Sequence, residues 1–360
     1  MKKRKFGFAM ASLLAVGTLL GACGAKEEAG NENTTETETE TTEDAFTVAM
    51  VTDIGGVDDR SFNQSTWEGI EAFGKDNGLE KGDGGYDYLQ SASEADYVQN
   101  INNLIQRDFD LVFAVGYALH DAVVEVAEQR TNAQIAIIDE IVPDLPNVAS
   151  IMFKANEGSF LAGVAAAKES KTGKIGFIGG VEGEIIGGFE AGFVAGAKAA
   201  NPDIEILIEY ADSFADAQKG QTIAALMYDQ GADIIMHASG ATGNGLFTEA
   251  KERKQKDPNA NVWVIGVDRD QYEEGQVNES TNVTLTSVLK RVDVAAQEVA
   301  KMTQEGNFPG GELITYGLAD NGIGLADSRG AISEETLAAV EDFQQQIIDG
   351  SLVVPEQPEE

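Results

Sequence analysis

The sequence predicts an α/β protein built from two doubly wound lobes, each with a parallel sheet, joined by a hinge. Apolar, β-branched runs alternate with helical patterns along the body of the chain. The strands are continuously apolar, which is typical of strands buried on both faces. The alternation also occurs in two successive blocks, 46–150 and 155–268. A chain of 360 residues is long enough to give each block its own core.

The first block opens with the strand FTVAMV (46–51). A helix follows over 62–78, where Trp67, Ile70 and Phe73 recur at helical spacing before a glycine stop. The same reasoning predicts strands at 86–90, 111–116, 134–139 and 147–153, with helices at 95–107 and 122–130.

The second block repeats this pattern. Strands are predicted at 174–180, 204–210, 233–240 and 261–268, with helices at 186–200, 215–230 and 243–255. A further strand and helix are expected within 282–302, a strand at 311–318 and a helix at 333–350. We therefore expect a first lobe of residues 46–152 plus about 290–308, and a second lobe of residues 153–288 plus about 310–350.

The amino terminus has the features of an export signal. Four basic residues at 2–5 precede an apolar run from Phe6 to Leu20, which is too short to be a comfortable membrane span. The run ends in LGAC, a lipobox, so residues 1–22 are predicted to be cleaved and Cys23 to carry a diacylglycerol. The alternative is an ordinary signal peptide followed by a chance cysteine. Cys23 has no intramolecular disulfide partner, since it is the only cysteine.

Residues 23–45 are rich in Glu and Thr and nearly free of apolar side chains. Such a segment cannot bury enough surface to offset its ordering entropy, and its like charges keep it extended. We interpret it as a tether that holds the lobes away from a membrane surface.

The charge balance excludes one class of partner. The chain carries 25 basic and 61 acidic residues, a net charge of −36. An acidic surface repels nucleic acid, and no basic patch or base-stacking motif argues otherwise. It also disfavours polyanionic ligands such as nucleotides, unless a local pocket overrides the field.

In doubly wound sheets the ligand lies at the carboxyl ends of the strands. The segments predicted there are rich in Asp, Ser, Gly and aromatic residues, which suits a polar, uncharged ligand with hydroxyl groups. They include TDIGG, QSASEADY, GYALHDA, DEIV, ADSFADA, ASGATGNG and VDRDQ.

The stretch TDIGGVDDRSFNQ (52–64) allows two interpretations. An acidic turn D-x-D-x-G-x-D-D holds the calcium ion of nucleoside hydrolases, but Val51 stands where its first aspartate is needed. One extra residue also separates Gly55 from Asp58. No other catalytic, dinucleotide or metal motif is present, so we expect no enzyme activity, cofactor or metal. His120 and His237, the only histidines, are expected to be loop residues without a catalytic role.

The second interpretation is the rim of a pocket. Ser61 can cap the helix that starts near Phe62, which places Phe62 and Asn63 on its first turn. A ring there can stack on a flat ligand, Asn63 offers a donor and an acceptor, and Asp53 faces the same cleft. The alternative is that Phe62 is a buried staple and Asn63 a surface residue.

Several motifs, in order, resemble one family over essentially the whole mature chain. They are the lipobox, TDIGGVDDRSFNQSTWEGI, VGYALHDAV, IGFIGG with FEAGFVAGA, DSFADAQKGQ, HASGATGNG and GVDRDQ. The chain resembles the basic membrane protein family, the PnrA-like purine nucleoside receptors of ABC importers. One departure is Glu184, where many members have Pro. The resemblance implies a type I periplasmic-binding-protein-like fold.

The resemblance also implies site residues. Phe62 and Phe214 would sandwich a nucleobase from opposite lobes. The base edge would bind Asp53, Asn63 and Asp121, and the ribose would bind Gly240, Asp268 and Lys290. Lys290 would neutralise Asp268 in a closed cleft.

Together these observations predict a substrate-binding lipoprotein that binds nucleosides, with purines favoured, for import. Its partners would be an ABC permease, an ATPase and, through the lipid on Cys23, the outer face of a Gram-positive cell membrane. Two alternatives stay open: a binding protein for another small polar ligand, such as a sugar or autoinducer, and a hydrolase-like enzyme.

Overall fold

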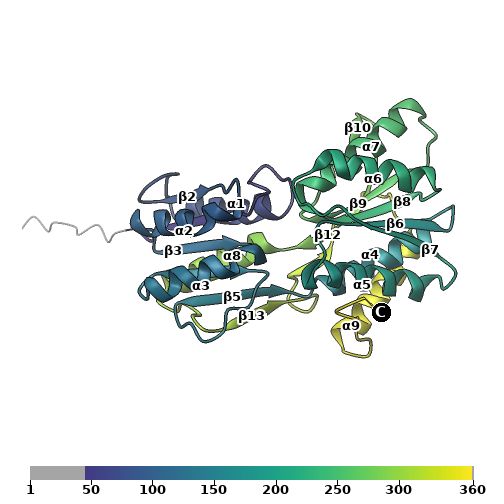
Figure 1. Ribbon diagram of the computed structural model, residues 1–360. Coiled ribbons are helices and arrows are strands. Elements are labelled where there is room, and N and C mark those ends of the chain that lie inside the picture. Colours follow the sequence, from purple (N-terminus) through teal and green to yellow (C-terminus); the bar gives the residue numbers. More distant parts are fainter. Residues whose placement is uncertain (1–44, 359–360) are drawn as a thin grey trace, which may run out of the picture. The chain divides into compact units, whose positions relative to one another are not determined.

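The structure, a computed structural model, describes residues 45–358. Within them, two six-stranded sheets form two lobes that belong to one compact unit. Helices pack on both faces of each sheet, which confirms the predicted α/β class (Figure 1). Cys23, the lipobox and all but the last residue of the tether lie outside the described residues.

The first sheet has the strand order β13-β5-β4-β3-β1-β2, and every pair is parallel. Its strands are β1 (Val48–Val51), β2 (Tyr86–Leu89), β3 (Leu111–Val115), β4 (Gln134–Ile138), β5 (Val148–Phe153) and β13 (Leu313–Tyr316). Its helices are α1 (Phe62–Asp76), α2 (Tyr97–Gln106), α3 (His120–Gln129) and α8 (Val292–Gln304).

Alternate residues of each central strand face opposite helix layers, because successive side chains of a strand point to opposite faces. Val48 and Met50 belong to the core beneath α1 and α8. Ala49 and Val51 belong to the core beneath α2 and α3. Both faces are thus covered, which explains why these strands are apolar throughout.

The second sheet has the order β14-β12-β9-β8-β6-β7 and is parallel except for β14. Its strands are β6 (Lys174–Gly179), β7 (Glu205–Tyr210), β8 (Ile234–Ala238), β9 (Trp263–Asp268), β12 (Thr284–Lys290) and β14 (Ile323–Leu325). Its helices are α4 (Ala155–Glu169), α5 (Glu184–Ala200), α6 (Ala217–Asp229), α7 (Gly243–Lys256) and α9 (Glu334–Ile348). A hairpin of β10 (Gln276–Asn278) and β11 (Thr281–Asn282) stands apart from both sheets.

The chain passes between the two sheets after β5, after β12 and after β13. The last passage corrects the expected division, which assigned residues from about 310 onward to the second lobe. β13 instead pairs with β5 of the first sheet, and Tyr316 stacks on Phe153 with ring centroids 5.4 Å apart. β13 is short and half exposed, so its sequence carries no pattern that identifies its partner strand.

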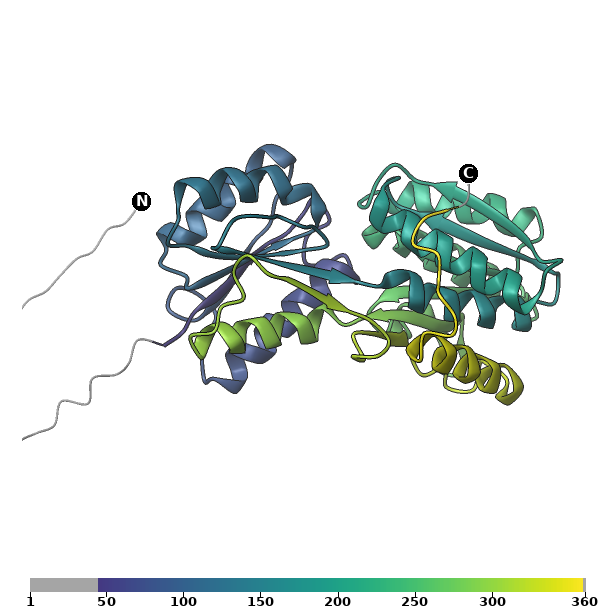
Figure 2. The same ribbon diagram turned by 90° about the horizontal axis from the view of Figure 1, so that it is seen from below.

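Helix α4 was not expected from the sequence. Nearly all of its residues from Ala155 to Ala167 are buried, so it has no polar face that would reveal helical periodicity. It packs tightly on α5, because Gly163, Gly192 and Gly196 bring the two backbones close together. The carboxyl-terminal segment crosses these helices, and Asn156 donates to the carbonyls of Val354 and Pro355 (Figure 2).

None of the helices within residues 45–358 combines the length and apolar character needed to cross a membrane.

Candidate functional site

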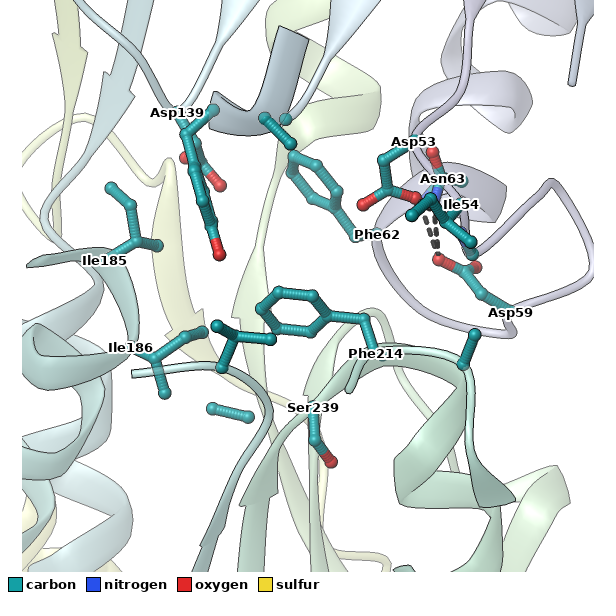
Figure 3. A pocket seen from close by; sticks show the side chains of 18 of the residues that line it. Asp53, Ile54, Asp59, Phe62, Asn63, Asp139, Ile185, Ile186, Phe214 and Ser239 are labelled. Atoms are coloured by element: carbon teal, nitrogen blue, oxygen red, sulfur yellow. Dashed lines mark hydrogen bonds between the residues drawn. The ribbon is translucent and has the colours of Figure 1, made fainter. Parts of the chain in front are cut away.

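A cavity of about 420 Å³ lies at the carboxyl ends of the strands, where both lobes contribute residues to its wall (Figure 3). In doubly wound α/β proteins, ligands bind at this end of the sheet. The residues expected from the sequence that line it are Asp53, Phe62, Asn63, Phe214, Gly240, Asp268 and Lys290.

Asp121 is the exception among the expected residues that the structure describes. It lies on the first turn of α3 with its carboxylate in solvent, where Oδ1 is 2.9 Å from Nδ1 of His120. The chain after β3 lines the cavity earlier, through Gly116, Tyr117 and Ala118. Asp121 therefore does not line the cavity that the other expected residues share, because α3 turns its first carboxylate away from the cleft.

Two aromatic rings face the cavity from opposite lobes. Phe62 comes from the first turn of α1 and Phe214 from the loop between β7 and α6 (Figure 3). Phe214 also meets Tyr117 of the first lobe edge to face, with centroids 6.3 Å apart. Each phenylalanine is only partly buried, so each can still cover the face of a flat ligand.

The position of Phe214 depends on two glycines. A Cβ at Gly180 would come within 2.2 Å of the Phe214 ring. Gly240 has φ +54°, and a Cβ there would come within 3.2 Å of the Phe214 carbonyl oxygen. A side chain at Gly180 would displace the Phe214 ring, and the positive φ of Gly240 favours glycine, whatever ligand is bound.

A polar wall closes one side of the cavity. Nδ2 of Asn63 donates to Oδ1 of Asp53 at 2.7 Å and to Oδ2 of Asp59 at 3.0 Å (Figure 3). The backbone N–H of Gly55 also donates to Oδ1 of Asp53, at 2.8 Å. Burial raises the pKa of Asp53 to about 6 against the lowering effect of these hydrogen bonds.

Asp59 rather than Ser61 caps helix α1. Its carboxylate accepts from the backbone N–H groups of Ser61, Asn63 and Gln64 at 2.8–3.0 Å. Ser61 occupies the N-cap position, but its hydroxyl donates across the cleft to Asp268. The expected cap by Ser61 is thus replaced by a carboxylate two residues earlier, which also suits the positive end of the helix dipole.

The same loop is held from the second lobe at several points. Asn244 donates to the Asp59 carbonyl at 3.1 Å, and Gln271 donates to the Arg60 carbonyl at 2.9 Å. The Arg60 guanidinium pairs with Glu274 at 2.6 Å. The loop that precedes Phe62 is therefore bonded to the second lobe at residues 59 and 60, next to the cavity.

Lys290 has a different partner from the one expected. Its ammonium group bonds to Asp139, not to Asp268, and it lies over the ring of Phe62 at 4.6 Å from the centroid. Burial raises the pKa of Asp268 to about 6, while the nearby charge of Lys290 lowers it. Lys290 thus acts on Asp268 through space, and its hydrogen bond ties β12 to the end of β4.

Sequence reasoning did not single out most of the lining, including the polar residues Asp139, Tyr117 and Tyr97. Asp139, Tyr117 and Tyr97 all come from segments that follow predicted strands, so the strand-end rule already contained them. Asp139 begins the DE pair after β4 and has φ +65°. The sequence does not show which residue of each segment points into the cavity.

Neither histidine lies in the cavity wall. His237 is fully buried, and its Nε2 lies 2.9 Å from Oε1 of Gln271. Burial lowers the pKa of His237 to about 4, so the ring is neutral at pH 7. It belongs to β8 rather than to a loop, which corrects the expected location. The described residues hold no cluster of His, Cys, Asp and Glu suited to a metal ion.

Comparison with known proteins places the chain among transport receptors. The profile of the Bmp family, described as "ABC transporter substrate-binding protein PnrA-like", matches residues 46–358. A Listeria innocua protein named CD4+ T-cell-stimulating antigen is 52% identical and covers 99% of this chain and 100% of its own. A Lactococcus lactis protein named ABC transporter nucleoside-binding protein BmpA is 41% identical, with 99% of each chain covered.

A solved structure has the same architecture. A solute-binding protein of an ABC transporter system from Aeropyrum pernix K1 aligns with a TM-score of 0.77 and 25% identity, over 86% of this chain and 94% of that one. The likeness confirms the predicted type I periplasmic-binding-protein-like fold.

Proposed function

The chain belongs to the Bmp family of PnrA-like ABC transporter substrate-binding proteins, and we propose that its ligand is a nucleoside, with purines favoured. The observation that carries this proposal is the pair of rings, Phe62 and Phe214, that face one cavity from opposite lobes. Stacking of a base on an aromatic ring contributes about 1–3 kcal/mol. The printed name of the Lactococcus lactis relative, a nucleoside-binding protein, supports the same ligand class.

In this proposal the polar groups divide between the two parts of the ligand. Asp53 and Asn63 receive N–H groups of the base, since both lie on the same wall as Phe62. Asp268 accepts hydroxyl groups of the ribose beside Gly240. Lys290 contributes its charge and its contact with Phe62 rather than a bond to Asp268.

Nucleotides are poor ligands in this account. Six acidic residues line the cavity, and Lys290 is already paired with one of them, Asp139. The six are Asp53, Asp59, Glu94, Asp139, Asp212 and Asp268. A phosphate would meet their repulsion in a site of low dielectric constant. The protein should therefore bind nucleosides in preference to nucleotides.

Binding between the lobes would close the cleft about the segments that follow β5, β12 and β13. The closed form would then dock on an ABC permease whose ATPase drives import. The lipid on Cys23 would hold the receptor at the outer face of the cell membrane, with residues 23–45 as the tether. The protein acts by binding and release rather than by catalysis.

Calorimetry of the full-length chain with guanosine, inosine, adenosine, cytidine, uridine, AMP and ribose tests the proposal. Nucleosides should bind, while AMP and ribose should bind at least a hundredfold more weakly. Chain that has been unfolded and refolded serves as the control for ligand retained during purification. If no nucleoside binds refolded chain, or if AMP binds as tightly as adenosine, the proposal fails.

A further inference from the structure

The hydroxyl group of Tyr97 is buried at the cavity and has no hydrogen-bond partner among residues 45–358. Tyr97 is the first residue of α2, and its ring packs in the core between the first sheet and α2. An unpaired buried hydroxyl costs folding free energy, so its presence at a ligand cavity calls for a functional explanation.

A second unpaired polar atom lies on the same cavity wall. Oδ1 of Asn63 is buried without a partner in the described part of the chain. The amide cannot turn round to exchange its two ends, because its nitrogen donates to the carboxylates of Asp53 and Asp59. An oxygen in that place would face two acceptors. Asn63 therefore presents only an acceptor to the cavity.

The phenol of Tyr97 presents a donor. Burial, together with the nearby charges of Asp53 and Glu94, holds its pKa well above the ordinary range, so the proton stays on the oxygen. Asp53 presents a further acceptor, since its Oδ1 takes the two N–H groups already described and its Oδ2 lies beside Gly116. One end of the cavity thus offers two acceptors and one donor.

We infer that Tyr97 is a specificity-determining residue whose hydroxyl donates a hydrogen bond to an acceptor atom on the ligand's ring, beside the N–H groups that Asp53 and Asn63 accept. The inference rests on the proposed function, in which that ring is a nucleobase. It extends the proposed function by naming the base edge that the cavity would bind, which has two N–H donors next to one carbonyl acceptor.

A purine with a 6-oxo group supplies this acceptor. Guanine carries a 2-amino group, an N1–H and O6 along one edge, which matches two acceptors and a donor in number and kind. Hypoxanthine keeps the N1–H and O6 but lacks the amino group, and 2-aminopurine keeps the amino group but lacks both O6 and the N1–H. Only guanine and hypoxanthine carry the O6 that Tyr97 would bond, so comparing each base between the wild type and a variant without the Tyr97 hydroxyl isolates that contact.

The test uses the Tyr97→Phe variant of the full-length chain, which keeps the ring and removes only the hydroxyl. Affinities for guanosine, inosine and 2-aminopurine riboside are measured by calorimetry. Guanosine and inosine should each bind roughly tenfold more weakly to the variant, as expected for one lost hydrogen bond. 2-Aminopurine riboside should bind the variant and the wild type equally.

The matched control is Tyr228→Phe. Its hydroxyl is also buried, but it donates to the Trp263 carbonyl at 3.0 Å in the second lobe, outside the cavity lining. This variant should unfold at lower denaturant concentration and keep all three affinities. Tyr97→Phe should show the reverse: a ligand-free stability that is equal or higher, because an unpaired hydroxyl has been removed, and altered affinities.

Equal losses for all three nucleosides would assign Tyr97 a packing role and overturn the inference, as would unchanged affinity for guanosine and inosine. Absence of nucleoside binding to the wild-type chain would instead refute the proposed function. The two failures are therefore distinguishable in the same set of titrations.

Discussion

Asp53 and Asp139 both follow strands of the first sheet and both line the cavity, but they differ in their partners. Asp139 is bonded to the ammonium group of Lys290. Lys290 is the last residue of β12, after which the chain passes to the first lobe. Within the described residues, Asp53 has only amide donors, from Asn63 and Gly55. A compensated carboxylate can hold the fold together, whereas an uncompensated one is left to bind a ligand.

The largest change in stability should follow from removing the Lys290 cation that pairs with the Asp139 carboxylate. Lys290→Met leaves Asp139 buried without its cation, so the free energy of unfolding in urea should fall by about 3–5 kcal/mol. The double variant Lys290→Met with Asp139→Leu should recover most of this loss, because the carboxylate that bonded directly to Lys290 is removed together with it. A single variant as stable as the wild type would show that the pair does not carry the structural role assigned here.

Replacing the two aspartates by asparagine should separate binding from folding. Asp53→Asn exchanges an acceptor for a donor at Oδ2, so nucleoside affinity should fall by about 1.5–3 kcal/mol with stability at pH 7 equal or higher. Asp139→Asn should instead lower stability, because Lys290 loses its counter-charge. Calorimetry and urea unfolding on both variants check this, and identical profiles for the two would contradict the distinction.

Binding and folding should also respond to pH in opposite directions. The pKa of Asp53 and that of Asp268 are both raised by burial to about 6 in the folded chain, from the ordinary value of 3.8. Protonation therefore favours the folded state, and these two groups should make the ligand-free chain more stable as pH falls from 7 to 5. That stability is lost as pH rises through about 6.

Nucleoside affinity should decrease over the same interval, because a protonated Asp53 no longer accepts an N–H of the base. The decrease approaches about tenfold per pH unit for each ionised carboxylate that the ligand requires. In Asp53→Asn the dependence should become shallower, with the part due to Asp268 remaining. An affinity that rises on acidification would mean that the ligand binds the protonated carboxyl groups.

The smallest effect is expected for Asp121→Asn. Its carboxylate is fully exposed on α3, so affinity and stability should both stay within about 0.5 kcal/mol of the wild type. Titration with guanosine measures the first and urea unfolding the second. A tenfold loss of affinity would show that Asp121 reaches the ligand in the closed form after all.

The sheets and the two rings that line the cavity were predicted better than the pairing partners of buried groups and strands. Buried strands and the loops after them follow from local composition, which is why Asp53 and Phe62 were found, whereas Phe214 was implied by the family resemblance. The partner of Lys290 depends on where β4 and β12 end relative to each other in space. The membership of β13 in the first sheet likewise depends on a pairing with β5, and neither relation has a local signal.

The family resemblance implied Asp121 rather than Asp139, and the local sequence does not distinguish the two. Both follow predicted strands, and the sequence does not reveal that α3 begins at His120 and turns its first carboxylate outward. The missed helix α4 illustrates the converse limit, because a helix buried on all sides has no periodic pattern to detect.

A crystal structure of the full-length chain with bound guanosine tests the central claim most directly. We expect the base between Phe62 and Phe214, its N–H edge toward Asp53 and Asn63, and the ribose at Asp268, with the Lys290–Asp139 pair intact. A base bound outside the two rings, or one whose N–H groups bond to Asp139 after that pair has broken, would contradict the account.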